Sequence, residues 1–333
     1  MYSLKNIFTN SKYNSIIFNE EETKAIERKI YTKQSRGKQS HGKETAYIKC
    51  LVRNKEVQLK PEEAVRQLYL YRLINTYNYP ISRIAVEYPV QFGREKKRAD
   101  IVIFENENSN VEYIIVELKR PNFEDGKEQL RSYCYATNAK IGVWTNGKNI
   151  SHYVRKQDEK KTDRILFESL DDLPTADQDL EDILKDPKTI DYLRKNDVLK
   201  SERKTLSELI KEIEDEVLAN SGEDVFEEVF KLIYTKLYDE LQCTRDETKI
   251  LEFRNYGGTD KKLKERIQTL FKKAKGKWKG VFKIDDEIEL TASHLAVCVS
   301  SLQNVKLFNS NLEVIDDAFE YLMNKTQKSE KGQ

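Results

Sequence analysis

The sequence predicts an α/β (α+β) domain with a central mixed sheet flanked by helices, followed by a mainly α-helical domain. Residues 99–104 and 113–118 are two runs rich in β-branched and aromatic residues around a polar loop, which predicts a hairpin. Both runs place apolar residues on both faces, as expected for central strands of a covered sheet. From about residue 200, apolar residues such as Val229, Ile233 and Leu237 recur with helical spacing.

The elements around this hairpin complete the predicted first domain. We expect a helix near 19–31 and a strand pair at 46–59. A helix at 61–77, beginning with Pro61, and a strand at 84–90 follow. After the hairpin come a helix at 125–137, strands at 140–145 and 150–155, and an edge strand at 164–169. The predicted organisation is an N-terminal extension with a basic loop (1–44), the first domain (45–169), an acidic helical connector (170–219) and a helical domain (220–333).

Composition argues against a disulfide-bonded secreted protein and against a membrane-spanning protein. The chain of 333 residues is long enough for two domains, and its 58 basic and 57 acidic residues leave a net charge of +1, so any nucleic-acid surface must be local. The four cysteines form no C-x-x-C pair, which is typical of a reduced, cytoplasmic protein. No apolar run approaches the ~20 residues of a membrane span.

Acidic residues gather at one end of the predicted hairpin. If Asp100 lies opposite Glu117, Ile101 faces Val116, and Asp100, Glu117 and Lys119 share one face. Two adjacent carboxylates repel each other, and a hard divalent ion removes that conflict. The pattern therefore predicts a Mg²⁺ site, with the Lys119 ammonium beside the ion and directed at an attacking water or at a phosphate.

These residues carry a family resemblance. Asp100, Glu117-Leu118-Lys119, Gln129 and Tyr133 resemble the PD-(D/E)xK nuclease pattern with its Gln-x-x-x-Tyr extension. The segments around them resemble the N-terminal nuclease domain of type I restriction enzymes: 61–67, 87–90, 97–102, 117–121 and 145–147. Ala99 stands where the pattern usually has proline.

The resemblance implies a metal-dependent DNA endonuclease of a restriction-modification system. Asp100, Glu117 and the Leu118 carbonyl would hold one or two Mg²⁺ ions, for which Mn²⁺ can substitute. An acid of the preceding helix, Glu63 in preference to Glu62, would join them. Lys119 would generate or position the hydroxide, Gln129 would orient the site, and Tyr133 would support Gln129.

Two basic segments are candidate contacts for double-stranded DNA. The first is the predicted turn at 92–98, next to the metal site, and the second is a basic helical stretch at 261–280. A solvated surface is the competing interpretation for both. The candidate DNA-binding residues are Arg94, Lys96, Lys97, Arg98, Lys272, Lys273, Lys275 and Lys277.

A second resemblance lies near the C-terminus. Residues 315–322, preceded by the helix from Asp224, resemble the helical N-terminal domain of type I N6-adenine methyltransferases. This implies a fragment of a single-chain restriction-modification protein, with S-adenosylmethionine bound only by a missing downstream methyltransferase domain. Site recognition would belong to a separate DNA specificity domain or subunit, and double-strand cleavage would need transient dimerisation. No G-x-x-x-x-G-K-[ST] loop for ATP is present.

Two other functions remain open from the sequence. The chain could be a catalytically silent module that binds DNA and serves as a scaffold in the same system. It could also be a repair or recombination nuclease of the same fold.

Overall fold

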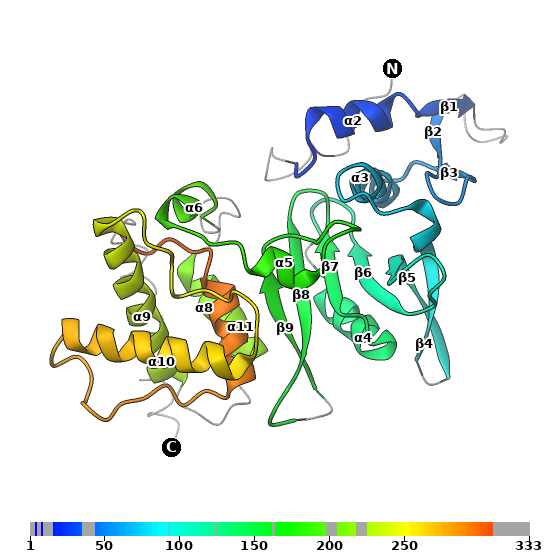
Figure 1. The fold of residues 1–333 in the computed structure, drawn as a ribbon. Coiled ribbons are helices and arrows are strands. Elements are labelled where there is room, and N and C mark those ends of the chain that lie inside the picture. The colour runs from blue at the N-terminus through cyan, green and yellow to red at the C-terminus, as the bar shows by residue number, and fades with distance from the viewer. Residues whose placement is uncertain are drawn as a thin grey trace, which may run out of the picture. The chain divides into compact units, whose positions relative to one another are not determined.

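The computed structural model describes residues 4, 8, 16–34, 44–92, 94–123, 125–161, 164–197, 205–217 and 225–308. The chain divides into two compact units, residues 1–155 with 170–179, and residues 156–169 with 180–333 (Figure 1). The elements that position the predicted site are α3 (Pro61–Asn75), β4 (Ile84–Phe92), β5 (Glu95–Phe104), β6 (Glu112–Leu118), α4 (Lys127–Thr137) and β7 (Ile141–Thr145).

A six-stranded mixed sheet contributes β4 to β7 and most of β8 (Ile150–Gln157) to the first unit, whereas most of β9 (Ile165–Leu170) belongs to the second. Its strand order is β4-β5-β6-β7-β8-β9. The β4/β5, β5/β6 and β7/β8 pairs are antiparallel, whereas β6 and β7 run parallel and are connected through α4. Helices α3 and α4 lie against this sheet (Figure 1). The predicted mixed sheet and its edge strand are confirmed.

The predicted hairpin register is also confirmed. Ile101 pairs with Val116, and Ile103 pairs with Ile114. Both faces are covered, because Val102 and Ile115 are as fully buried as their neighbours. Because side chains alternate along a strand, this register also fixes which residues beyond the apolar stretch lie across from each other.

A smaller sheet precedes α3. It has the order β1-β2-β3, formed by Tyr31–Gln34, Glu44–Lys49 and Glu56–Gln58. Ile48 pairs with Val57, so the predicted strand pair at 46–59 is confirmed. The predicted helix near 19–31 is α2 (Glu20–Glu27), which Asn19 caps by accepting a hydrogen bond from the Glu22 amide.

The prediction of a basic turn over residues 92–98 is wrong. Strand β4 continues to Phe92 and β5 already begins at Glu95, so Lys96, Lys97 and Arg98 lie on a strand of a long hairpin. Extension of the hairpin beyond the covered sheet explains how strongly polar residues adopt strand structure here: their side chains stay in solvent while the backbone remains paired.

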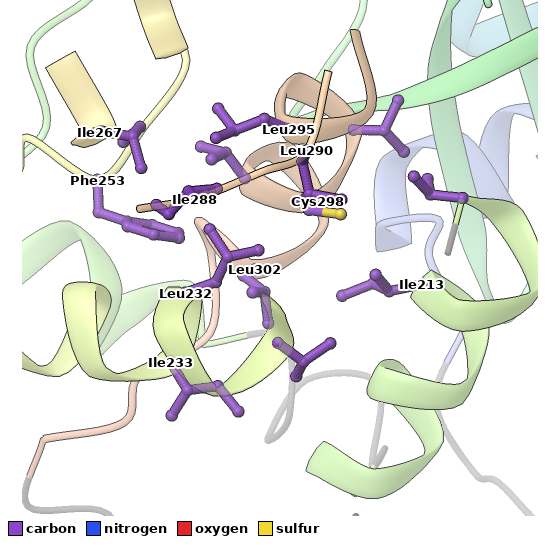
Figure 2. Packing of buried hydrophobic residues seen from close by; sticks show 14 of the residues in the cluster. Ile213, Leu232, Ile233, Phe253, Ile267, Ile288, Leu290, Leu295, Cys298 and Leu302 are labelled. Carbon is purple, nitrogen blue, oxygen red and sulfur yellow. The ribbon is translucent and has the colours of Figure 1, made fainter. Parts of the chain in front are cut away.

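The second unit has a helical core. It contains α5 (Leu180–Leu184), α6 (Ile190–Lys195), α8 (Leu206–Glu216), α9 (Val225–Arg245), α10 (Asp260–Lys277) and α11 (Ala292–Leu302). Figure 2 shows Ile213 of α8, Leu232 and Ile233 of α9, Ile267 of α10 and Leu295 of α11 converging on one apolar cluster. The helical region predicted after the sheet is therefore confirmed.

This core also encloses an ion pair. Lys236 Nζ lies 3.0 Å from Glu240 Oε1, and both side chains are almost completely buried. Glu240 Oε2 also accepts a hydrogen bond of 2.9 Å from the Leu307 amide. A buried carboxylate is costly unless it is paired, so Lys236 compensates the charge of Glu240. Glu240 in turn holds the chain segment at Leu307 against the core.

Some predictions fall on residues outside those described. These are the basic loop beyond Gln34 and the methyltransferase-like stretch at 315–322. Within the described ranges, no helix combines the length and the apolar character needed to cross a membrane.

Candidate active site

The site lies at the C-terminal end of β6, beside Asp100 in the middle of β5. The register of the two strands places Asp100 across from Glu117, one residue beyond the Ile101–Val116 pair. Asp100 Oδ2 accepts a hydrogen bond of 2.7 Å from the Leu118 amide, which fixes its carboxylate against β6. The sequence prediction that these two acids are neighbours agrees with this geometry.

Helix α3 supplies a cation to the same place. Arg66 Nη2 lies 2.6 Å from Asp100 Oδ1, while Arg66 Nη1 bonds Glu63 Oε2. Glu62 Oε1 is farther from the guanidinium, at 3.6 Å, and the Glu62 side chain is 46% exposed. Glu63 is held further by Gln67 Nε2, which donates to Oε1 at 2.7 Å. Arg66 therefore connects the helix acids to Asp100.

Burial dominates the electrostatics of Glu117. Burial first, and then the charge of Asp100, raise the pKa of the Glu117 carboxyl to about 7. Its Oε1 lies 2.6 Å from Lys119 Nζ, which opposes the shift only in part. Oε2 is buried and accepts no hydrogen bond from any residue in the described ranges. This oxygen has an unsatisfied capacity to bind a cation or a proton.

A chain of hydrogen bonds leads from Lys119 to helix α4. Lys119 Nζ donates to Gln129 Oε1 at 3.2 Å, and Gln129 Nε2 lies 3.1 Å from the Tyr133 hydroxyl. Tyr133 in turn donates to the Arg98 carbonyl at 2.7 Å, on strand β5. Gln129 and Tyr133 are thus neighbours in one hydrogen-bond chain, and their roles as orienting residue and support stay predictions.

A glycine makes room for the lysine. Gly126 precedes α4 with φ +115°, and a Cβ at this position would overlap Lys119 Cε. The main chain here therefore needs a residue without a side chain for two reasons, its backbone conformation and its approach to Lys119.

The backbone is also unusual across from Asp100 on the other side of β5. Strand β4 pairs Val86 with Ile101 and Tyr88 with Ala99, and Glu87 between them has φ +54°. A left-handed conformation costs about 1–2 kcal/mol for a residue with a Cβ. The Glu87 carboxylate forms an ion pair with Arg53, which stabilises this irregular stretch of β4.

The residues present fit a hard divalent ion. Asp100 and Glu117 offer carboxylate oxygens, Leu118 lies between Glu117 and Lys119 with its carbonyl, and Glu117 Oε2 is an orphaned buried acceptor. Mg²⁺ is commonly bound through one or two carboxylates and several waters. Among the described residues, no group of three or more His, Cys, Asp or Glu side chains is arranged to hold a metal. A site here would thus depend on two carboxylates, with Glu63 committed to Arg66 and Gln67.

A comparison with protein families identifies the segment that carries this geometry. Residues 61–174 match the family model of the type I restriction enzyme R protein N terminus (HSDR_N). The matched segment begins with α3, includes every residue of the candidate site and ends after β9. A search of curated proteins finds no match to this chain. The resemblance to type I restriction enzymes predicted from the sequence is confirmed for this R protein N-terminal segment.

The predicted DNA-binding residues fall into two groups. Arg94, Lys96, Lys97 and Arg98 are exposed near the candidate site, on or just before β5. The lysines of α10 belong to the second unit, and several serve that unit itself. Lys272 and Lys273 lie 3.7 and 3.5 Å from Glu287 and Glu252, and Lys275 donates to the Asp286 carbonyl at 2.6 Å. Lys277 is exposed.

Sequence reasoning missed Arg66 and Gly126. A signal for Arg66 was available, because it follows Glu62 and Glu63 at the spacing of helical ion pairs. Its bond to Asp100 joins residues 34 positions apart and depends on how α3 packs against the sheet. Gly126 carried only the general association of glycine with helix ends.

Proposed function

We propose that the segment 61–174 is the nuclease domain of a restriction enzyme and hydrolyses DNA phosphodiester bonds with the help of a divalent cation. The observation that carries the proposal is the pair Asp100 and Glu117 with Lys119 beside it, inside a segment that matches the R protein N terminus. Bound there, Mg²⁺ or Mn²⁺ would supply Lewis acidity and an activated water.

The side chains of the site have distinct roles in this proposal. Asp100 and Glu117, with the Leu118 carbonyl, would hold the cation. Lys119 presents an ammonium next to Glu117, where it can orient the attacking water and offset the negative charge that grows on the phosphate. Gln129 receives a hydrogen bond from Lys119 and so fixes the direction of that ammonium.

The proposed substrate is double-stranded DNA. The exposed residues Arg94, Lys96, Lys97 and Arg98 would contact phosphates beside the reacting bond, which predicts binding that weakens steeply with salt. Because type I restriction enzymes are assemblies, we propose that site recognition comes from another domain or subunit. A methyltransferase domain, its S-adenosylmethionine and a cytoplasmic location remain predictions from the sequence.

Nicking of supercoiled plasmid tests the proposal directly. The full chain should nick DNA with Mg²⁺ or Mn²⁺ and should be inactive in EDTA. Asp100→Asn and Lys119→Met should each lower the rate by at least ~100-fold. Lys140→Met is the matched control, because Lys140 is an exposed lysine that pairs with Glu105. No nicking by the wild-type chain with either ion, or full activity of Asp100→Asn, would contradict the proposal.

One observation favours a DNA-binding scaffold as the second candidate. Within the described ranges no three-acid group is set up for a metal, and Asp100 already bonds Arg66. A scaffold would retain salt-sensitive DNA binding in Asp100→Asn and Lys119→Met while the wild type shows no cleavage.

A further inference from the structure

The charges at the candidate site do not balance without an added cation. Four carboxylates converge there, from Glu62, Glu63, Asp100 and Glu117, and two cationic side chains, from Arg66 and Lys119, answer them. Two negative charges remain when all four acids are ionised. A single divalent ion would neutralise this excess.

Arg66 is built into the site more firmly than a surface ion pair. Its side chain is only 7% exposed, and its two terminal nitrogens each bond a different carboxylate. Burial by itself lowers the pKa of the guanidinium, but Glu63 and Asp100 more than offset this and the pKa stays raised, so the positive charge is permanent. The planar fork of an arginine suits such a bridge between two carboxylates.

The Arg66 bridge separates the acid that is held on α3, Glu63, from the acid that can accept a cation, Glu117. Glu63 has both oxygens committed, one to Arg66 and one to Gln67. Glu117 keeps Oε2 without a partner in the described part of the chain. Asp100 also has both oxygens bonded, Oδ1 to Arg66 and Oδ2 to the Leu118 amide, but a carboxylate oxygen has two lone pairs and can still ligate an ion. The place of Asp100 across from Glu117 is what distinguishes it from Glu63.

We propose that Arg66 takes the place of a second metal ion, so that the site binds one divalent cation between Asp100 and Glu117 while Glu63 anchors the arginine; this rests on the proposed nuclease function. Arg66 is a positioning residue in this arrangement. It bonds Asp100 Oδ1 from α3, while the Leu118 amide holds Oδ2 against β6, and it prevents Glu62, Glu63 and Asp100 from forming a second cation site.

Isothermal titration calorimetry of the full chain with Mn²⁺ tests the inference without any measurement of cleavage. The wild type should bind one ion per chain. Arg66→Met removes the guanidinium that pairs with Glu62, Glu63 and Asp100. This variant should therefore bind a second ion or bind the first at least ~10-fold more tightly. A purely structural arginine would give unchanged or weaker binding when removed.

A double variant keeps the test decisive if Arg66→Met folds poorly. Arg66→Met combined with Glu63→Gln removes one positive and one negative charge, so the net charge of the site is unchanged. It should return to one ion with an affinity within about threefold of the wild type. A loss of at least ~10-fold in this double variant would show that Glu63 or Arg66 contributes to binding of the first ion, and it would overturn the inference.

The remaining outcomes separate the inference from the function on which it rests. One ion in the wild type, lost in Asp100→Asn but unchanged in stoichiometry and affinity in Arg66→Met, would overturn the role of Arg66 and leave the nuclease proposal standing. No Mn²⁺ binding by either the wild type or Arg66→Met would contradict both.

Discussion

The Glu117 carboxyl should make the metal-free protein less stable as pH rises. Its pKa is about 7 in the folded chain, because of burial and then the charge of Asp100, against an ordinary value of 4.5. A folded-state pKa above the unfolded one means that the folded state binds the proton more tightly. The stability from this group is therefore fully present below about pH 4.5 and is lost as pH rises through 7.

The size of this loss of stability follows from the difference between the folded and unfolded pKa values of Glu117. A shift of one pKa unit corresponds to about 1.4 kcal/mol, so Glu117 should account for roughly 3 kcal/mol of unfolding free energy between these two pH values. Glu117→Gln has nearly the same shape and cannot ionise. The variant should match the wild type near pH 4.5 and become more stable than it by roughly 3 kcal/mol above pH 7.

Urea unfolding in EDTA measures this difference. Trp144 pairs with Glu117 across β6 and β7, so its fluorescence reports the relevant sheet once the other tryptophan is replaced by Trp278→Phe in both proteins. Asp100→Asn should shrink the pH dependence, because it removes the second cause of the shift. Parallel wild-type and Glu117→Gln curves across the whole range would refute the reasoning.

Three further substitutions test other contacts by the same unfolding measurement. Gly126→Ala should cost about 1–3 kcal/mol, because it forces a Cβ into Lys119 at φ +115°, and nicking should fall with it; an unchanged unfolding midpoint would contradict this. Tyr133→Phe removes a hydroxyl that donates to a strand carbonyl at 2.7 Å and should cost about 1 kcal/mol; a neutral result would mean that the bond is not formed. Lys236→Met leaves Glu240 buried without its cation and should cost about 3–5 kcal/mol, and a loss below about 1 kcal/mol would count against the buried pair.

Local pattern was sufficient to predict the hairpin that builds the site. The runs 99–104 and 113–118, apolar on both faces, predicted a hairpin of covered strands, and the register considered there, with Asp100 across from Glu117, is the observed one. The order of residues along α4 similarly predicted that Gln129 and Tyr133 share a face, and the two are hydrogen-bonded.

Features that depend on tertiary packing could not be predicted in this way. The bond from Arg66 to Asp100 exists because α3 packs beside the end of β5, and no local pattern reports that distance. The strand conformation of Lys96, Lys97 and Arg98 was missed for a related reason. Their charges indicated a turn, whereas pairing with β4 keeps the backbone extended. The lysines of α10 formed a continuous basic run in sequence, and only the fold revealed that several of them stabilise their own unit.

The proposal that a divalent ion is held by Asp100 and Glu117 is tested most directly by anomalous diffraction from crystals grown with Mn²⁺. We expect one anomalous peak, about 2.1 Å from carboxylate oxygens of both residues, with Arg66 still bonded to Glu63. An absence of a peak between Asp100 and Glu117, at a Mn²⁺ concentration that supports nicking, would contradict the proposed site.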